Sequence, residues 1–257
     1  MSVTDHLLRP LLARNPSRPM LTYYDGPGGY RVELSVATAA NWAAKTANWL
    51  RDECDVEPGT PVVVALPAHW QTLGVLLGSW WCGAHVVAAT GGDGLGDEEA
   101  AVAFVPATAV EAHRGTATTI AKVGLDALGM SGGGQDDDAV DYTSEIRIQP
   151  DDFVPWSPVP GSTPALLGMT VDEVLATAEE RASALGVERG SRVLSALEWT
   201  LPAGVLDGVL AVFAREAGLV QYGTAPGGVV DPERLASLRD SELAALVLPR
   251  TGGVDGA

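Results

Sequence analysis

With 257 residues and a formal charge of −17, the chain is long enough to bury a core without disulfide staples and is strongly acidic. Its hydrophobic content is 46%, with only 6% aromatic residues, which indicates an interior rich in Ala, Val and Leu. We expect no nucleic acid and no membrane as partner, because proteins that bind either surface normally carry clustered Lys and Arg.

The N-terminal segment predicts a helix that reaches Arg14 and then a β-hairpin within residues 20–34. The hairpin turns at residues 25–29, where the sequence Asp-Gly-Pro-Gly-Gly is typical of a turn. Residues 1–20 contain arginines but no apolar run as long as that of a signal peptide. We therefore expect a cytoplasmic protein.

Residues 35–90 predict a unit with the order helix, turn, strand, helix, strand. Ser35 is expected to be the N-cap of the first helix, because apolar residues follow it at helical spacing as far as Leu50. A β-branched apolar run predicts a buried strand at residues 61–66, and a second helix and strand follow at residues 68–81 and 85–89.

Two further strands, at residues 101–105 and 116–123, are expected after this unit. They are followed by residues 129–141, where the run Gly-Gly-Gly-Gln-Asp-Asp-Asp predicts an acidic mobile loop. On this basis we assign residues 1–150 to a first α/β lobe and residues 151–257 to a second.

The order helix, turn, strand, helix, strand returns in the second lobe. Thr170 and Glu173 form a capping-box pattern before a helical apolar face, and Asp231 followed by proline predicts the start of a final helix. Strands are expected at residues 192–197 and 219–222, with a helix at 202–213 between them. Three residue pairs lie 135 positions apart and one lies 131 apart, which indicates an internal repeat with a small difference in loop length: Val36 and Val171, Leu50 and Leu185, Gly83 and Gly218, and Gly59 and Gly190.

The alternation of strands and helices decides the fold class. Strands joined by crossover helices have parallel neighbours, and the helices cover the faces of the sheet. We therefore predict an α/β fold made of two similar doubly wound lobes with mostly parallel sheets.

No complete catalytic site or metal site is found. Residues 129–133 fit the G-x-S-x-G pattern of serine hydrolases, which makes hydrolysis through Ser131 an alternative function. However, all four histidines precede Ser131, whereas the histidine of an α/β-hydrolase follows its serine. A glycine-rich run at residues 92–96 lies among acidic residues that would repel a pyrophosphate, and the histidines and the two cysteines lack metal-ligand spacing.

The segment 152–164 joins the two lobes and is the remaining candidate. Its glycine and hydroxyl residues are of the type that wraps a phosphate with backbone N–H groups, but its four prolines remove donors. No Lys or Arg follows it before Arg181.

Four motifs in this order resemble the N-terminal part of the adenylate-forming superfamily, which includes acyl-CoA synthetases, peptide-synthetase adenylation domains and luciferases. They are Asn-Pro-Ser-Arg-Pro-Met-Leu-Thr at residues 15–22, Glu-Pro-Gly-Thr-Pro-Val-Val-Val at 57–64, the helix and Gly-Ala strand at 73–87, and Val-Glu-Arg-Gly-Ser-Arg-Val-Leu at 187–194. The resemblance covers nearly the whole chain, and it is strongest to a short actinobacterial branch.

The resemblance implies a phosphate loop at residues 156–168, in a form that has lost its lysine. The residues that correspond to a cofactor-binding loop are Trp156, Ser157, Gly161, Ser162 and Thr163. Trp199 falls where the family places a His or aromatic residue of the acyl pocket, although a core aromatic is the alternative. The adenine and ribose motifs, the metal-organising glutamate and the catalytic lysine of the lid would lie beyond Ala257.

The resulting hypothesis is a non-catalytic or degenerate relative of AMP-binding acyl-CoA synthetases, which acts in ligand sensing or partner docking. The first alternative is an adenylating subunit that another chain completes. We predict no catalytic residue, no metal and no cofactor, with ATP, AMP or acyl-CoA as the alternative ligands. A homodimer or a protein partner is expected, because the lobe face that a C-terminal domain would cover is left open.

Overall fold

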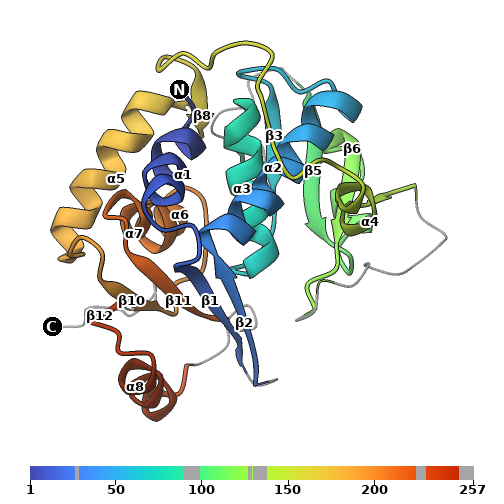
Figure 1. Ribbon diagram of the computed structural model, residues 1–257. Helices are drawn as coiled ribbons and strands as arrows, with labels where there is room; N and C mark the ends of the chain where they lie inside the picture. Colours follow the sequence, from blue (N-terminus) through green and yellow to red (C-terminus); the bar gives the residue numbers. More distant parts are fainter. Residues whose placement is uncertain (27–28, 90–98, 127–128, 130–137, 224–229, 249–257) are drawn as a thin grey trace, which may run out of the picture.

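The computed structural model describes the chain except for residues 27–28, 90–98, 127–128, 130–137, 224–229 and 249–257 (Figure 1). Its N-terminal part contains α1 (Val3–Arg14) and then the antiparallel pair β1 (Pro19–Asp25) and β2 (Tyr30–Ser35). The predicted helix and hairpin are both confirmed. Because β2 ends at Ser35, the hairpin runs directly into the next helix.

The first repeat unit contains α2 (Val36–Glu53), β3 (Pro61–Val64), α3 (Trp70–Cys82) and β4 (His85–Val87), in the predicted order. The Ser35 side chain accepts a hydrogen bond from the Thr38 backbone N–H, so it is the N-cap of α2, as expected. His69 caps α3 in the same way, through the backbone N–H of Gln71.

The segment between the units holds β5 (Ala100–Pro106), a 3-10 turn (Glu111–His113) and β6 (Ala117–Val123), then β7 (Val140–Asp141) and α4 (Tyr142–Arg147). Residues 140–141 were expected in a mobile loop, but they pair with β6 as β7. Asp141 also caps α4, because its side chain accepts a hydrogen bond from the backbone N–H of Ser144. Residues 130–137 of the predicted acidic loop lie outside the described residues.

The second unit starts with a hairpin that the sequence reading did not anticipate, β8 (Pro164–Leu166) and β9 (Met169–Thr170). The predicted capping box at Thr170 is present and opens α5 (Val171–Leu185), which leads to β10 (Arg192–Ser195). The helix predicted at residues 202–213 consists of α6 (Ala203–Val205), a π-helical turn (Leu206–Leu210) and α7 (Ala211–Ala214). The chain continues through β11 (Gly218–Gly223), α8 (Pro232–Ser241) and β12 (Leu246–Leu248).

The strands form two mostly parallel sheets, which confirms the predicted α/β class. One sheet has the order β12-β10-β11-β1-β2 and the other the order β7-β6-β5-β3-β4-β8-β9. The two hairpins are therefore exchanged: β1 of the N-terminal segment pairs with β11, and β8 of the second half pairs with β4. Each sheet thus takes its hairpin from the other half of the chain, where the halves are those divided at residue 150.

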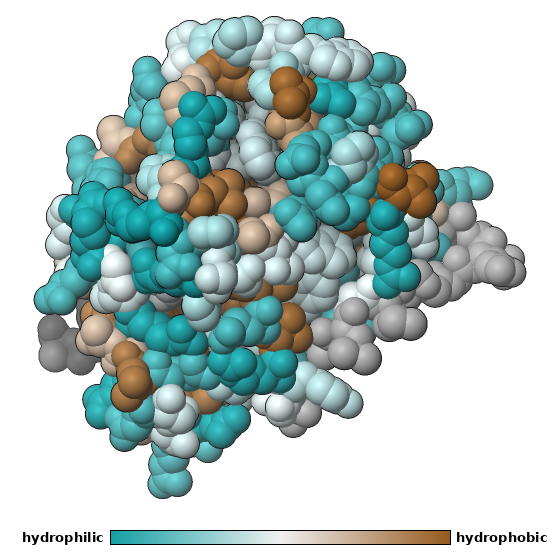
Figure 2. All heavy atoms as spheres, viewed as in Figure 1, coloured by the Kyte–Doolittle hydropathy of each residue, from teal (hydrophilic) through white to brown (hydrophobic). Residues whose placement is uncertain are grey.

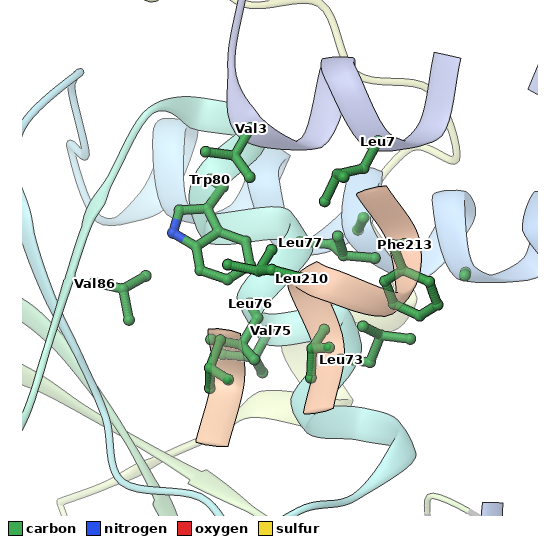
Figure 3. Packing of buried hydrophobic residues seen from close by; sticks show 14 of the residues in the cluster. Val3, Leu7, Leu73, Val75, Leu76, Leu77, Trp80, Val86, Leu210 and Phe213 are labelled. Atoms are coloured by element: carbon green, nitrogen blue, oxygen red, sulfur yellow. The ribbon is translucent and has the colours of Figure 1, made fainter. Parts of the chain in front are cut away.

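The main core lies where the helices of both units meet. Figure 3 shows Val3 and Leu7 of α1 above Trp80 and Leu77 of α3, together with Leu210 and Phe213 of the second unit. All these side chains are buried and belong to one cluster. A smaller cluster lies on the opposite face of the five-stranded sheet, where α8 packs through Leu238 (Figure 1). Figure 2 shows that hydrophilic side chains cover most of the visible surface.

The structure also corrects the internal alignment. Gly83 ends α3 in the left-handed conformation, and the residue that ends the helix before β11 in this way is Glu216, which has a φ of 51°. In both units the next backbone N–H then closes the same turn, from Ala84 to Ser79 and from Ala217 to Val212. Gly83 thus corresponds to Glu216, 133 positions away, and not to Gly218. Most of the change in offset from 135 to 131 arises in the helix, because α2 has 18 residues and α5 has 15, and the turn that follows the helix is one residue shorter in the second unit.

Candidate functional site

A cavity of about 230 Å³ lies at the carboxyl ends of strands from both sheets. In open parallel sheets, ligands bind outside the carboxyl ends of the strands, so this position is the expected one for a binding site. We call it the carboxyl-edge cleft. It is lined by the last residue of β3 and by residues that follow β3, β4 and β10: Val64, Ala65, Leu66, Pro67, Ala88, Ala89, Glu198, Trp199, Thr200 and Leu201.

Trp199 forms part of the cleft wall and is held in one orientation. Its indole N–H donates to Oε1 of Gln221 at 3.2 Å, and the Gln221 amide group donates in turn to the Leu197 and Tyr222 carbonyls. A Cβ at Gly208 would lie 3.4 Å from the indole, so the π-helical turn packs closely against the ring. Trp199 is only 4% exposed and therefore combines a place in the cleft wall with a place in the core.

The loop that carries Trp199 is tightly packed because of a glycine and a serine. The Ser195 hydroxyl accepts a hydrogen bond from the Leu197 backbone N–H at 3.1 Å, which closes the loop directly after β10. Any side chain at Gly204 would overlap with the carbonyl oxygen of Glu198. The position of Glu198 and Trp199 is therefore set by backbone contacts that only glycine at 204 permits.

Two ionisable groups of this region, Tyr23 and His69, have shifted pKa values and are neutral at pH 7. Burial raises the pKa of Tyr23, and the negative charges of Asp25 and Glu198 raise it further. Burial lowers the pKa of His69 to about 4, although the charge of Asp126 opposes this, so the imidazole is neutral at pH 7. The Tyr23 and His69 rings lie in edge contact, with their centroids 4.7 Å apart.

The segment before the predicted phosphate loop is bound along α2, away from this cleft. Three α2 side chains spaced three residues apart donate to its carbonyl oxygens. Lys45 Nζ donates to Gln149 at 2.5 Å, the Asn48 amide to Pro150 at 3.2 Å and Asp152 at 2.9 Å, and Arg51 Nη1 to Val154 at 2.5 Å. We call residues 149–157 the strap.

The strap brings Trp156 and Ser157 to a different cavity, of about 290 Å³, at the amino ends of β3 and β4. Arg51 lies in this cavity, with its guanidinium 4.9 Å from the Phe153 ring centroid and 5.1 Å from that of Trp156. Its charge is already paired with the Asp52 carboxylate, which accepts from Nε at 2.6 Å and from Nη2 at 2.8 Å. The positive charge of Arg51 is therefore already paired with a carboxylate of the protein.

The other predicted loop residues, Gly161, Ser162 and Thr163, form a turn at the start of α5. The backbone N–H groups of Val171 and Asp172 donate to the carbonyls of Thr163 and Gly161, so these helix N–H groups are used inside the protein. A side chain at Gly161 would overlap with the carboxylate of Asp172, and this negative charge opposes an anion at the turn. Ser162 is exposed and Thr163 is buried. None of these residues lies in the lining of the carboxyl-edge cleft.

No family model matches the sequence. The chain is 40% identical over 221 residues to the TIGR03089 family protein of Mycobacterium tuberculosis (strain ATCC 25618 / H37Rv), with 84% of this chain and 87% of that protein covered. The chain belongs to the TIGR03089 family.

Solved structures that share the fold of this TIGR03089 member are adenylate-forming ligases. The acyl-CoA synthetase of Brucella canis superposes with a TM-score of 0.77 at 13% identity, and 96% of this chain covers 47% of it. The acetoacetyl-CoA synthetase of Streptomyces lividans gives 0.74 at 17% identity, with 96% and 42% covered. The anthranilate CoA ligase AuaEII, in complex with anthranoyl-AMP, gives 0.69 at 18% identity, with 88% and 45% covered. The TIGR03089 chain has the N-terminal fold of these ligases and spans less than half of their length.

Ser131 and the glycine-rich run at residues 92–96 are outside the described residues. Within the described part of the chain, no group of His, Cys, Asp and Glu could hold a metal ion, and no helix is both long and apolar enough to cross a membrane.

The sequence did not predict two features of the TIGR03089 chain, one in the carboxyl-edge cleft and one along α2. The first is Glu198, an acidic residue directly before the tryptophan that was singled out. The second is the row Lys45, Asn48 and Arg51, which is polar within an otherwise Ala-rich helix and could have indicated a bound neighbour.

Proposed function

We propose that this TIGR03089 member is a non-catalytic cytoplasmic relative of adenylate-forming ligases, which uses the carboxyl-edge cleft to bind a small ligand. The fold places a cavity at the carboxyl ends of parallel strands, where α/β proteins bind ligands. Trp199 is fixed in the wall of that cavity by Gln221. The scaffold is therefore suited to recognition of a small molecule.

The observation that carries the non-catalytic part of the proposal is the path of the strap. Transfer of an adenylyl group depends on positioning the phosphates and neutralising their charge. The described residues that resemble the phosphate loop lie at the amino ends of the strands or at the turn before α5, apart from the cleft. Arg51, whose guanidinium lies beside the Trp156 ring, is paired with Asp52. These residues would not hold a triphosphate against a carboxylate in the cleft.

Pyrophosphate exchange tests the proposal directly. The purified chain is incubated with ATP, labelled pyrophosphate, magnesium and a panel of carboxylic acids, beside an active acyl-CoA synthetase as the positive control. We expect exchange at the level of the reaction without protein. Thermal-shift measurements with ATP, AMP, CoA and acyl-CoAs complement it, since a ligand at a hundredfold over its Kd stabilises the folded state by about 2.7 kcal/mol. Carboxylate-dependent exchange by the chain alone would contradict the proposal.

A second candidate is an adenylating subunit completed by another chain. It is favoured by the length comparison, because this chain covers between 42% and 47% of the three enzymes compared above. Exchange that appears only after a second chain is added would support this candidate. In that case the partner would have to supply the groups that bind the triphosphate.

We further propose that the protein docks a partner, either a second copy or another protein. A solution mass by light scattering tests this for the homodimer. A monomeric mass over the micromolar range, together with no binding of a hydrophobic dye, would contradict an open apolar face.

A further inference from the structure

Four strands lie at the edges of the two sheets within the described part of the chain, and they differ in length. β12, β7 and β9 have three, two and two residues, whereas β2 has six. Proteins normally keep edge strands short, because the unpaired N–H and C=O groups of a long one can pair with another chain. Among the residues that the structure describes, β2 pairs with β1 and with no other strand, so it ends the five-stranded sheet (Figure 1).

The outer side of β2 is regular enough to receive a further strand. Residues 30–34 pair with residues 21–25 of β1 without a register shift, and the irregularity of the hairpin lies at its far end, between Pro19 and Leu21. β2 contains neither proline nor lysine, two residues that protect exposed edges. In an antiparallel pair every second residue directs its N–H and C=O groups away from its neighbour, so β2 presents such groups along its outer side.

The side chains of β2 separate into an apolar face and a charged face. Leu34 belongs to the main core and Val32 packs against it, while Tyr30, in the same alternation, is 58% exposed. Arg31 and Glu33 alternate with these residues and lie on the other face. Arg31 Nη2 donates to Glu33 Oε2 at 2.6 Å, so the two charges cancel within the strand.

A second copy of β2 is complementary to this edge in one register. Two antiparallel copies centred on Val32 place Arg31 of each copy opposite Glu33 of the other, and Tyr30 opposite Leu34. A shift by two residues in either direction would instead place Arg31 opposite Arg31 or Glu33 opposite Glu33, which is unfavourable. Charged residues normally protect an edge from pairing. Here two-fold symmetry makes them match, because such a contact joins the same patch of both copies.

The charge of the whole chain also bears on where two copies can meet. Each chain has a formal charge of −17, so two copies repel each other at long range. β2 carries one arginine and one glutamate and therefore has no net charge of its own. At physiological salt the screening length is about 8 Å, so the distant charges are largely screened and the local match can decide.

We propose that the chain forms a two-fold homodimer in which the β2 strands of two copies pair antiparallel, centred on Val32, and join the two five-stranded sheets into one. This inference rests on the proposed docking of a partner, because it names the partner as a second copy and the surface as β2. A single strand pair buries less area than a stable interface does, so we expect a reversible dimer with a Kd in the micromolar range.

Two charge reversals test the register. Arg31→Glu places glutamates opposite each other in the strand pair, and Glu33→Arg places arginines opposite each other. Each variant alone should raise the dimer Kd by at least about tenfold, measured by analytical ultracentrifugation at physiological salt after circular dichroism has shown that the variant is folded. An equimolar mixture of the two variants should form a heterodimer with a Kd near that of the unmodified chain, because every arginine then lies opposite a glutamate. A mixture that stays monomeric would overturn the inference.

Arg9→Glu is the matched control. Arg9 is exposed and paired with Asp5 of its own helix, and its reversal changes the net charge as much as Arg31→Glu does. The dimer Kd of Arg9→Glu should stay within about twofold of the unmodified value. An equal loss in both variants would show a general charge effect and contradict pairing through β2.

Hydrogen exchange of the unmodified chain tests the contact without any variant. Those amides of residues 30–34 that face away from β1 should exchange more slowly well above the dimer Kd than well below it, because they donate to the second copy only in the dimer. Exchange in β2 that is independent of protein concentration would overturn the inference.

The outcomes separate this inference from the proposed function. A monomeric mass of the unmodified chain throughout the micromolar range would overturn the β2 contact and the homodimer together. A dimer that persists in both Arg31→Glu and Glu33→Arg would overturn the β2 contact and leave docking of a second copy in place. Pyrophosphate exchange, measured on the same samples, tests the non-catalytic proposal independently.

Discussion

The two repeat units have the same order of elements but differ in what their helices contact. Each unit consists of a hairpin, a capped helix, a strand, a second helix and a strand, followed by one more parallel strand. In the first unit α2 has an additional turn and carries the polar row that binds the strap. In the second unit the corresponding helix is shorter, and its helix partner contains a π-helical turn beside Trp199. The same scaffold thus holds a bound segment in one unit and a cleft wall in the other.

The largest expected effect concerns the crossing of α2 and α3. A Cβ at Gly78 would overlap with Thr46 and lie 2.9 Å from the Ala43 carbonyl, whereas the corresponding residue of the second unit is Ala211. Gly78→Ala should therefore destabilise the protein by about 3 kcal/mol, because the helices must move apart. Urea unfolding followed by circular dichroism measures this. Ala211→Gly is the reciprocal control. A larger loss of stability in Ala211→Gly than in Gly78→Ala would contradict the conclusion that α2 and α3 form the closer crossing.

The next effect concerns the strap. Asn48 is buried and donates to two carbonyls, so Asn48→Ala should lower the free energy of unfolding by about 2 kcal/mol and increase hydrogen exchange in residues 149–157. Ser183, its counterpart in α5, is exposed, and Ser183→Ala should change stability by less than about 0.5 kcal/mol. Unchanged hydrogen exchange in the strap of Asn48→Ala would mean that these bonds do not hold it.

The pH should affect stability through the first unit only at the start of its second helix. The N-cap residue there is His69, which titrates, whereas the corresponding residue of the second unit is Pro202. The pKa of His69 is about 4 in the folded protein and near 6.5 when unfolded, so the unfolded state binds the proton more readily. The contribution of neutral His69 to the free energy of unfolding is therefore fully present above pH 6.5 and decreases as the pH falls toward 4. At pH 5.5 the free energy of unfolding is lower by about 1.4 kcal/mol. His69→Asn keeps a capping side chain without this titration, and the stability difference between the two proteins should change with pH by that amount. A difference that stays constant between pH 7 and pH 5.5 would exclude His69 as the titrating group.

The smallest effect concerns the two left-handed helix ends. Glu216 adopts a positive φ that disfavours side chains, but its carboxylate is paired with Arg14 and Arg189. Glu216→Gln keeps the unfavourable backbone and removes both ion pairs, so it should destabilise by about 1 kcal/mol, a small value because both arginines are largely exposed. Glu216→Gly also relieves the backbone and should be more stable than the Gln variant by about 1 kcal/mol. A Gly variant that is less stable than the Gln variant in thermal unfolding would contradict the cost assigned to the positive φ of Glu216.

Short-range signals in the sequence determined the elements and their order. Ser35, Thr170 and Asp231 accept hydrogen bonds at the predicted helix starts, since a cap depends only on residues two or three positions away. The β-branched runs predicted the central strands, and the repeated order of strands and helices predicted the parallel α/β class. The family resemblance also followed from these local motifs.

Only the tertiary structure decided which strands pair and where the candidate residues lie. A hairpin such as β1 and β2 carries the same local signal whichever sheet it joins, and its pairing with β11 depends on residues almost 200 positions away. The path of the strap depends on Lys45, Asn48 and Arg51, about 100 positions before the carbonyls that they bind. Such contacts form only when the packed helices bring distant segments together, so the sequence determined what the pieces are, and the packing of the core determined that Trp156 and Trp199 lie in separate cavities.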